Sequence, residues 1–229
     1  MEEPQTPRQL VTSGVTEEQQ SQLRSLGDLV LSAYIETGKM RASIALAEHS
    51  ISILNDLMRQ DRESGYSLST DIPAHISLVQ HWPPIAATYA ISTLYQFREV
   101  LNGFGEWMDA STIKPWLVEP DFVSNALALF EKNFPKWEAT RHATAHSAEI
   151  RRKVDKNLHS APLSKGPVRK NKGSTMIMQD TFDGRTMYTT RRGELLKFEA
   201  TPENYQRLLA VYNLLLSGAR VDTSRPLQS

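Results

Sequence analysis

Apolar residues recur at intervals of three and four over most of the first two thirds of the chain, which is the period of amphipathic helices. The first such stretch covers residues 16–37, where Thr16 can cap a helix whose first turn carries acids and Gly38 can end it. A second apolar stripe covers residues 41–62. The pattern therefore predicts two consecutive helices with a break at Gly38.

A third helical pattern covers residues 73–102. Pro83 and Pro84 interrupt it, and proline inside a helix removes a hydrogen-bond donor and clashes with the preceding turn, so we expect a break or kink there. Residues 103–120 are rich in glycine, proline and tryptophan, which predicts an ordered connection rather than a helix.

Two further helices are expected before the pattern changes. One begins near Asp121, and the next begins near Pro135 and ends between residues 153 and 158. The sequence up to this point predicts an up-and-down bundle of four to five helices.

The period then shortens to that of β-strands, with turn residues between the strands. The strand candidates are residues 174–179, 185–190 and 194–199. Asp183-Gly184 is a strong hairpin signal. A last amphipathic helix, residues 201–217, is expected to cover one face of this small sheet.

The predicted fold class is therefore mainly α: a helical bundle followed by a small C-terminal β-meander plus helix. We predict a disordered tail at residues 1–14, the helical bundle at 15–158 and a basic linker at 159–173. A small β-β-β-α unit at 174–217 and a loose tail at 218–229 follow.

Composition excludes several classes of chemistry. The chain has no cysteine, which excludes disulfides, thiolate zinc sites and cysteine nucleophiles. It also lacks a nucleophile elbow, a Walker phosphate loop and a dinucleotide-binding glycine motif. No signal peptide and no membrane-spanning apolar run are visible in the sequence. We expect a cytoplasmic protein with no cofactor, no resident metal and no membrane association.

The net charge of zero conceals two halves of opposite sign. Residues 1–150 hold 11 basic and 19 acidic residues, whereas residues 151–229 hold 15 basic and 7 acidic ones. Such a division is compatible with nucleic-acid binding, with attraction between the halves, or with acidic and basic faces that meet in a dimer.

The predicted helix that follows Pro135 concentrates the reactive side chains of the chain, namely Glu138, Arg141, His142, His146 and Glu149. At 3.6 residues per turn, Glu138, His142 and His146 share one face. The first and last of these lie about 12 Å apart along the axis, so the three do not bind one metal ion. A metal site made of His142 and His146 with Glu48 or His49 stays open as an alternative.

The same helix also suits acid–base chemistry without a metal. Cleavage of RNA by the 2′-hydroxyl needs a group that titrates near neutral pH, which imidazole does. It also needs a cation to stabilise the charge of the transition state, which a guanidinium does with two donors. Arg141, His142 and His146 supply this set, and a second copy of the helix across a two-fold axis would close a groove around it.

The segment Arg141-His-Ala-Thr-Ala-His146 resembles the motif of the HEPN superfamily, an arginine, a polar residue and a histidine late in an all-α bundle. The resemblance covers residues 15–158. It implies a usually dimeric bundle that is either a metal-independent endoribonuclease of toxin–antitoxin or antiviral defence systems or a non-catalytic scaffold. It further implies that Arg141 and His146 are catalytic and that His142 is the polar motif residue.

We accordingly expect an RNA substrate, a homodimer, and an antitoxin or other protein partner. Glu138 and Glu149 would support the catalytic residues. The basic residues that follow the motif would hold RNA phosphates, namely Arg151, Arg152, Lys153 and Lys170. A solvated helix end is the alternative role for these cations. The alternatives for the whole chain are a non-catalytic binding or scaffold protein of the same fold and a metal-dependent helical-bundle enzyme.

Overall fold

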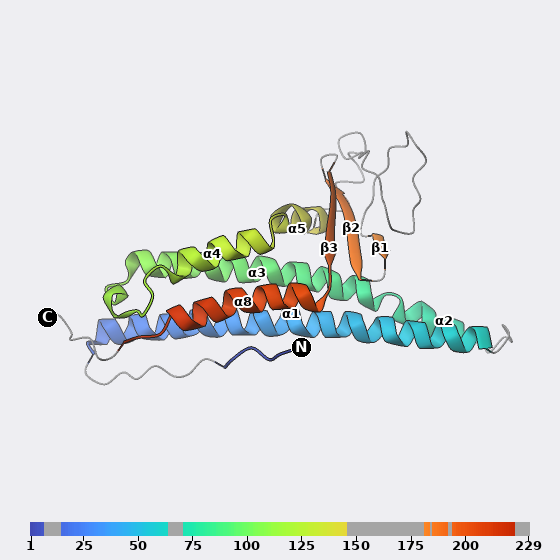
Figure 1. Ribbon diagram of the computed structural model, residues 1–229, viewed down its shortest axis with the longest axis horizontal. Helices are drawn as coiled ribbons and strands as arrows, with labels where there is room; N and C mark the ends of the chain where they lie inside the picture. Colours follow the sequence, from blue (N-terminus) through green and yellow to red (C-terminus); the bar gives the residue numbers. More distant parts are fainter. Residues whose placement is uncertain (7–14, 64–70, 146–180, 184, 192–193, 223–229) are drawn as a thin grey trace. The chain divides into compact units, whose positions relative to one another are not determined.

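A computed structural model describes residues 1–6, 15–63, 71–145, 181–183, 185–191 and 194–222. Helices dominate this part of the chain, and a small antiparallel sheet precedes the last helix (Figure 1). The predicted fold class, mainly α with a small C-terminal β-meander and a helix, is confirmed. Within the described residues, no helix is both long and apolar enough to cross a membrane.

Helix α1 runs without interruption from Glu17 to Glu63, which corrects the prediction of two helices separated at Gly38 (Figure 1). Its start is a capping box, because the Thr16 hydroxyl accepts from the Gln19 amide at 3.2 Å and the Gln19 side chain accepts from the Thr16 amide at 2.9 Å. Glycine in a helix interior costs only about 0.5–1 kcal/mol relative to alanine. The apolar stripes on both sides of Gly38 outweigh this cost once they are buried.

The break before α3 falls at residues 80–81, slightly before the predicted position. Helix α2 covers Asp71–Val79 and α3 covers Trp82–Ala110. Pro83 and Pro84 therefore lie in the first turn of α3, where a missing N–H leaves no helical bond unmade.

Helix α3 also extends through Gly103 and Gly105, where the sequence predicted a connection. A Cβ at Gly103 would stand 3.0 Å from Cδ2 of Leu29 on α1, so this glycine permits close packing of the two helices. A short 3-10 helix, η1 (Lys114–Trp116), follows. The predicted helix start near Asp121 is confirmed by α4, Phe122–Asn133, and α5 covers Trp137–Ala145. The predicted end of α5 lies outside the described residues.

The chain divides into two compact units. Unit 1 comprises Met1–Met40, Thr93–Pro135 and Glu203–Ser229. Its core is built around aromatic rings: Phe97 stacks on Phe130 at 6.0 Å between ring centres, and Phe104 meets Phe122 edge-on at 5.9 Å. Unit 2 comprises Arg41–Ser92 and Lys136–Pro202.

Helix α8, Pro202–Gly218, belongs to the core of unit 1. Its Tyr212 ring lies 6.3 Å from the ring of Tyr34 on α1, and the Asn133 side chain at the end of α4 donates to the Arg207 carbonyl at 3.1 Å. The sequence predicted a different grouping, with this helix and the small sheet in one unit at 174–217, whereas the helix groups with unit 1 and the strands group with unit 2. An amphipathic stripe shows that a helix buries one face, but it does not identify the partner.

Both ends of unit 1 contain ordered segments where the sequence predicted loose tails. After α8, Val221 pairs with Leu117, and the Asp222 amide donates to the Trp116 carbonyl at 2.8 Å. At the other end, the Tyr205 and Tyr212 hydroxyls donate to the carbonyls of Glu2 and Gln5. These bonds satisfy backbone groups that the sequence alone leaves unassigned. The remainder of both predicted tails lies outside the described residues.

The sheet of unit 2 has the strand order β1-β2-β3, with both pairs antiparallel. The strands are β1 (Thr181–Asp183), β2 (Thr186–Arg191) and β3 (Glu194–Glu199). The two later strand predictions are confirmed to within one residue. The predicted strand at 174–179 lies outside the described residues, and β1 was not predicted. Asp183 pairs with Thr186, as the Asp-Gly hairpin signal predicts.

We predict that Gly218→Ala lowers the free energy of unfolding by about 1–3 kcal/mol, because the added Cβ would overlap Cβ and Cγ of Phe122 in the packed core. Gly38→Ala is the matched control. It meets nothing within 4 Å and should raise stability by about 0.5–1 kcal/mol through its better helix propensity. Urea denaturation followed by circular dichroism measures both. Equal effects of the two substitutions would contradict the packing of α8 on α4.

We further predict that Tyr212 makes the protein sensitive to alkali. Burial and, to a lesser degree, the neighbouring Tyr34 raise the pKa of Tyr212 from 10.0 to about 12. Between these values the unfolded chain loses the phenolic proton and the folded chain keeps it, so stability falls as pH rises from 10 to 12. The loss attributable to Tyr212 is up to about 2–3 kcal/mol.

The measurement is the free energy of unfolding of the wild type and of Tyr212→Phe at pH 9 and at pH 12. The wild type should lose more stability across this interval than the variant, which carries no phenol at this position. A difference of zero between the two losses would refute the assignment.

Candidate functional site

Helix α5 carries the residues that the sequence singles out. Two threonines bond to the backbone of their own helix, since the Thr140 hydroxyl donates to the Lys136 carbonyl and the Thr144 hydroxyl donates to the Thr140 carbonyl, each at 2.9 Å. Each hydroxyl thereby satisfies its own hydrogen-bonding need inside the helix. The described part of the helix spans nine residues, and a helical segment of this length depends on tertiary packing more than on helix propensity.

One face of α5 packs on the sheet of unit 2. Ala143 and Leu196 of β3 are both buried and contact each other, and Ala139, one turn before Ala143, packs against them. Thr140 is also buried. The alanines are small, so the helix lies close to the strands, and this face is structural.

The opposite face of α5 carries Glu138, Arg141 and His142. The Glu138 side chain is 69% exposed and that of His142 is 32% exposed, and Arg141 is half-buried. His142 Nε2 lies 3.6 Å from Glu138 Oε1, at the i,i+4 spacing that the sequence predicts. The structure therefore brings together an acid, an imidazole and a guanidinium on the face opposite the buried alanines.

The remaining predicted site residues lie outside the described part of the chain. They are the proposed catalytic His146, the supporting Glu149, and the basic residues Arg151, Arg152, Lys153 and Lys170. The Arg141–His146 pairing thus stays a prediction, as does the end of the helix that carries it.

The metal alternative involved Glu48 or His49 of α1 as a third ligand. Glu48 instead forms an ion pair with Arg185, 3.4 Å from Nη2 to Oε1, and His49 is exposed. Among the described side chains, no group of three histidines, aspartates or glutamates is placed to hold a metal ion.

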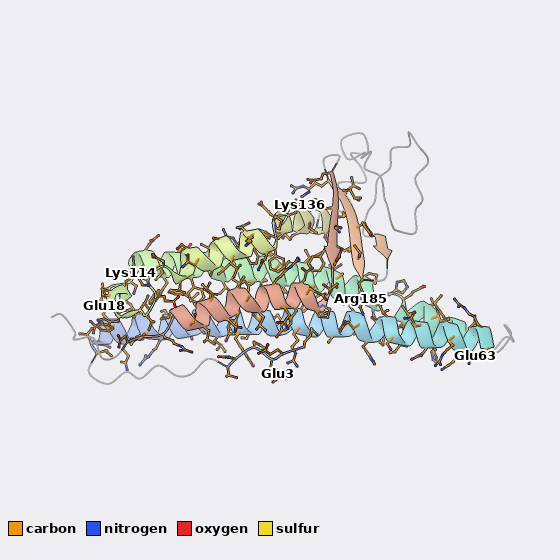
Figure 2. All side chains as sticks on the ribbon, viewed as in Figure 1. Glu3, Glu18, Glu63, Lys114, Lys136 and Arg185 are labelled. Carbon is orange, nitrogen blue, oxygen red and sulfur yellow. The ribbon has the colours of Figure 1, made fainter. Side chains whose placement is uncertain are left out.

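Sequence reasoning missed two cations beside the sheet. Lys136, at the start of α5, forms an ion pair with Glu194 of β3, and Arg185, before β2, forms the pair with Glu48; both cations are labelled in Figure 2. The turn signal at Asp183-Gly184 predicted that Arg185 lies next to a hairpin turn, but it did not indicate that Glu48 is its partner. Both ion pairs are largely exposed, so each contributes little to stability.

No family model, curated protein or solved structure matches this chain. The functional argument consequently depends on the residues of the chain and their arrangement alone.

We predict that the two faces of α5 respond differently to substitution. Ala143→Asp buries a carboxylate against Leu196 and should lower the free energy of unfolding by about 2–4 kcal/mol. Glu138→Ala removes only an exposed pair with His142 and should change it by less than about 0.5 kcal/mol. Urea titrations measure both changes. A large loss in Glu138→Ala would show that the outer face is structural too.

Proposed function

We propose that this chain is a HEPN-like, metal-independent endoribonuclease that acts as a homodimer. The observation that supports the proposal is the division of α5, whose alanine face packs on the sheet while Arg141 and His142 lie half-buried on the opposite face. A guanidinium and an imidazole on one helix face are the side chains that the proposed chemistry needs. The motif of this helix, Arg141 to His146, resembles that of the HEPN superfamily.

In the proposed reaction the 2′-hydroxyl of RNA attacks the adjacent phosphorus. His146 takes the proton of the 2′-hydroxyl as the new P–O bond forms. The bond between phosphorus and the 5′-oxygen breaks, and the 5′-oxygen leaves with a proton from water. Arg141 donates two hydrogen bonds to the non-bridging oxygens as negative charge develops on them. The products are a 2′,3′-cyclic phosphate and a 5′-hydroxyl end. His142 orients the reacting groups, and Glu138 holds His142 through the i,i+4 contact.

The proposed partners follow from this chemistry. A second copy of the chain would close the groove, and the basic residues 151–153 with Lys170 would bind RNA phosphates, which makes binding salt-dependent. We further propose that the protein acts in the cytoplasm, as a toxin or in antiviral defence, and that an antitoxin regulates it.

We predict that the purified protein cleaves RNA in the presence of EDTA and that Arg141→Ala and His146→Ala each lower the rate by at least about a hundredfold. Denaturing gels of a labelled RNA measure the rate, and phosphatase treatment identifies the cyclic phosphate. Arg59→Ala and His49→Ala are matched controls, because both residues are exposed on α1, and both variants should cleave at the wild-type rate.

Activity that survives both test substitutions, or that requires added metal, would refute the proposal. Protein without nuclease activity, in which Arg141→Ala and His146→Ala only lower the melting temperature, would favour the non-catalytic scaffold instead.

A further inference from the structure

The first six residues of the sequence lie on α8 in a manner that indicates a binding site for peptides. They have no helical or strand structure and run alongside the helices of unit 1 (Figure 1). The Tyr205 hydroxyl donates to the Glu2 carbonyl, and the Tyr212 hydroxyl donates to the Gln5 carbonyl. Both contacts are to main-chain oxygens, which every peptide presents, so the recognition does not depend on the side chains at these two positions.

The spacing of the two hydroxyls matches an extended chain. Tyr205 and Tyr212 are seven residues apart on α8, which is two helical turns or about 10.5 Å of rise. The three residues from Glu2 to Gln5 span about 9–11 Å when they are extended or in the polyproline II conformation. A helical or tightly turned segment of this length would be too short to reach both hydroxyls.

Pro4 lies between the two anchored carbonyls and is buried, whereas Glu2, Glu3 and Gln5 are exposed. Glu3 is labelled on this segment in Figure 2. The ring of proline fixes φ near the polyproline II value, and this conformation has no internal hydrogen bonds, so its carbonyls are available to outside donors. The segment thus has the features of a polyproline II ligand: a buried proline flanked by main-chain acceptors.

The surface beneath the segment is aromatic. We define the tyrosine face as Tyr205 and Tyr212 of α8 together with Tyr34 of α1, whose ring lies 6.3 Å from that of Tyr212. Tyr205 and Tyr212 have no exposed surface with the segment in place. Aromatic faces whose hydroxyls donate to peptide carbonyls are a common means of recognising proline-rich segments.

We propose that the tyrosine face is a binding site for an extended, proline-containing peptide of another protein, and that residues 2–5 of this chain occupy the site in cis. This function is separate from the proposed nuclease, because it uses side chains of unit 1 whereas α5 belongs to unit 2. A segment joined to the site through the chain competes at an effective concentration on the order of millimolar. A partner gains access when it binds more tightly than this internal competitor or when the segment is displaced.

The experiment uses the full chain and a fluorescent peptide that copies residues 2–8, Glu-Glu-Pro-Gln-Thr-Pro-Arg. Pro4→Asp displaces the internal segment, because aspartate is disfavoured in the buried proline position. Fluorescence anisotropy should show that this variant binds the peptide at least tenfold more tightly than the wild type. A peptide with alanine at both prolines should bind Pro4→Asp at least tenfold more weakly than the original peptide.

Removal of the two donors tests the site itself. Adding Tyr205→Phe and Tyr212→Phe to the Pro4→Asp chain should weaken peptide binding at least tenfold while the phenylalanine rings preserve the packing. Tyr89→Phe in the same background is the control, since Tyr89 is 49% exposed on α3 and should have no effect. No saturable binding to Pro4→Asp, equal binding of the alanine peptide, or equal affinity after both Phe substitutions would each overturn the proposal.

A second measurement needs no added peptide. In the otherwise unchanged chain, Tyr205→Phe and Tyr212→Phe together should release the segment, so a glutamate-specific protease should cut after Glu2, whose carbonyl accepts from Tyr205, at least fivefold faster than in the wild type. Circular dichroism establishes that the variant is folded, and mass spectrometry identifies the cut. An unchanged rate in a folded variant would show that the two hydroxyls do not hold the segment.

Discussion

The burial of α8 is the constraint on which unit 1 depends. Tyr205, Leu208, Tyr212 and Leu215 are fully buried along this helix, which comes last among the helices yet completes a core begun by α1 and continued by α3 and α4. A helix so apolar on one side has no stable alternative in water, since each large side chain contributes about 1.5–3 kcal/mol on burial. The same burial aligns the tyrosine hydroxyls in a row, which provides donors for the first residues of the chain.

Packing within unit 2 determines which side chains α5 exposes. The sheet of unit 2 buries Leu196 against Ala143 of α5, and small residues at this contact leave the long polar side chains of α5 on the other face. The geometry of α5 is thereby fixed by packing rather than by the charged residues themselves.

Local signals predicted the parts of the fold that local physics controls. The helix cap at Thr16, the hairpin turn after Asp183 and the proline-led start of α8 all appear where the sequence indicates them. The predicted helix end at Gly38 and the predicted connection from Gly103 were wrong, because glycine is only a weak helix breaker. Burial of the apolar residues around each glycine outweighs its cost. The i,i+4 face of Glu138 and His142 was likewise predictable from helical period alone.

Long-range partners could not be predicted, because no single-sequence pattern encodes them. Nothing in the residues around Tyr205 indicates that its hydroxyl reaches Glu2, some two hundred positions earlier in the chain. Equally, Arg185 gave no sign of its pairing with Glu48. The cost of leaving a buried polar group unpaired forces such contacts to form, but the cost is the same for any partner of suitable geometry. At the tyrosine face, the two hydroxyls contact main-chain carbonyls three residues apart, and such carbonyls are not specific to residues 2–5, which is the basis for proposing that another peptide can replace this segment.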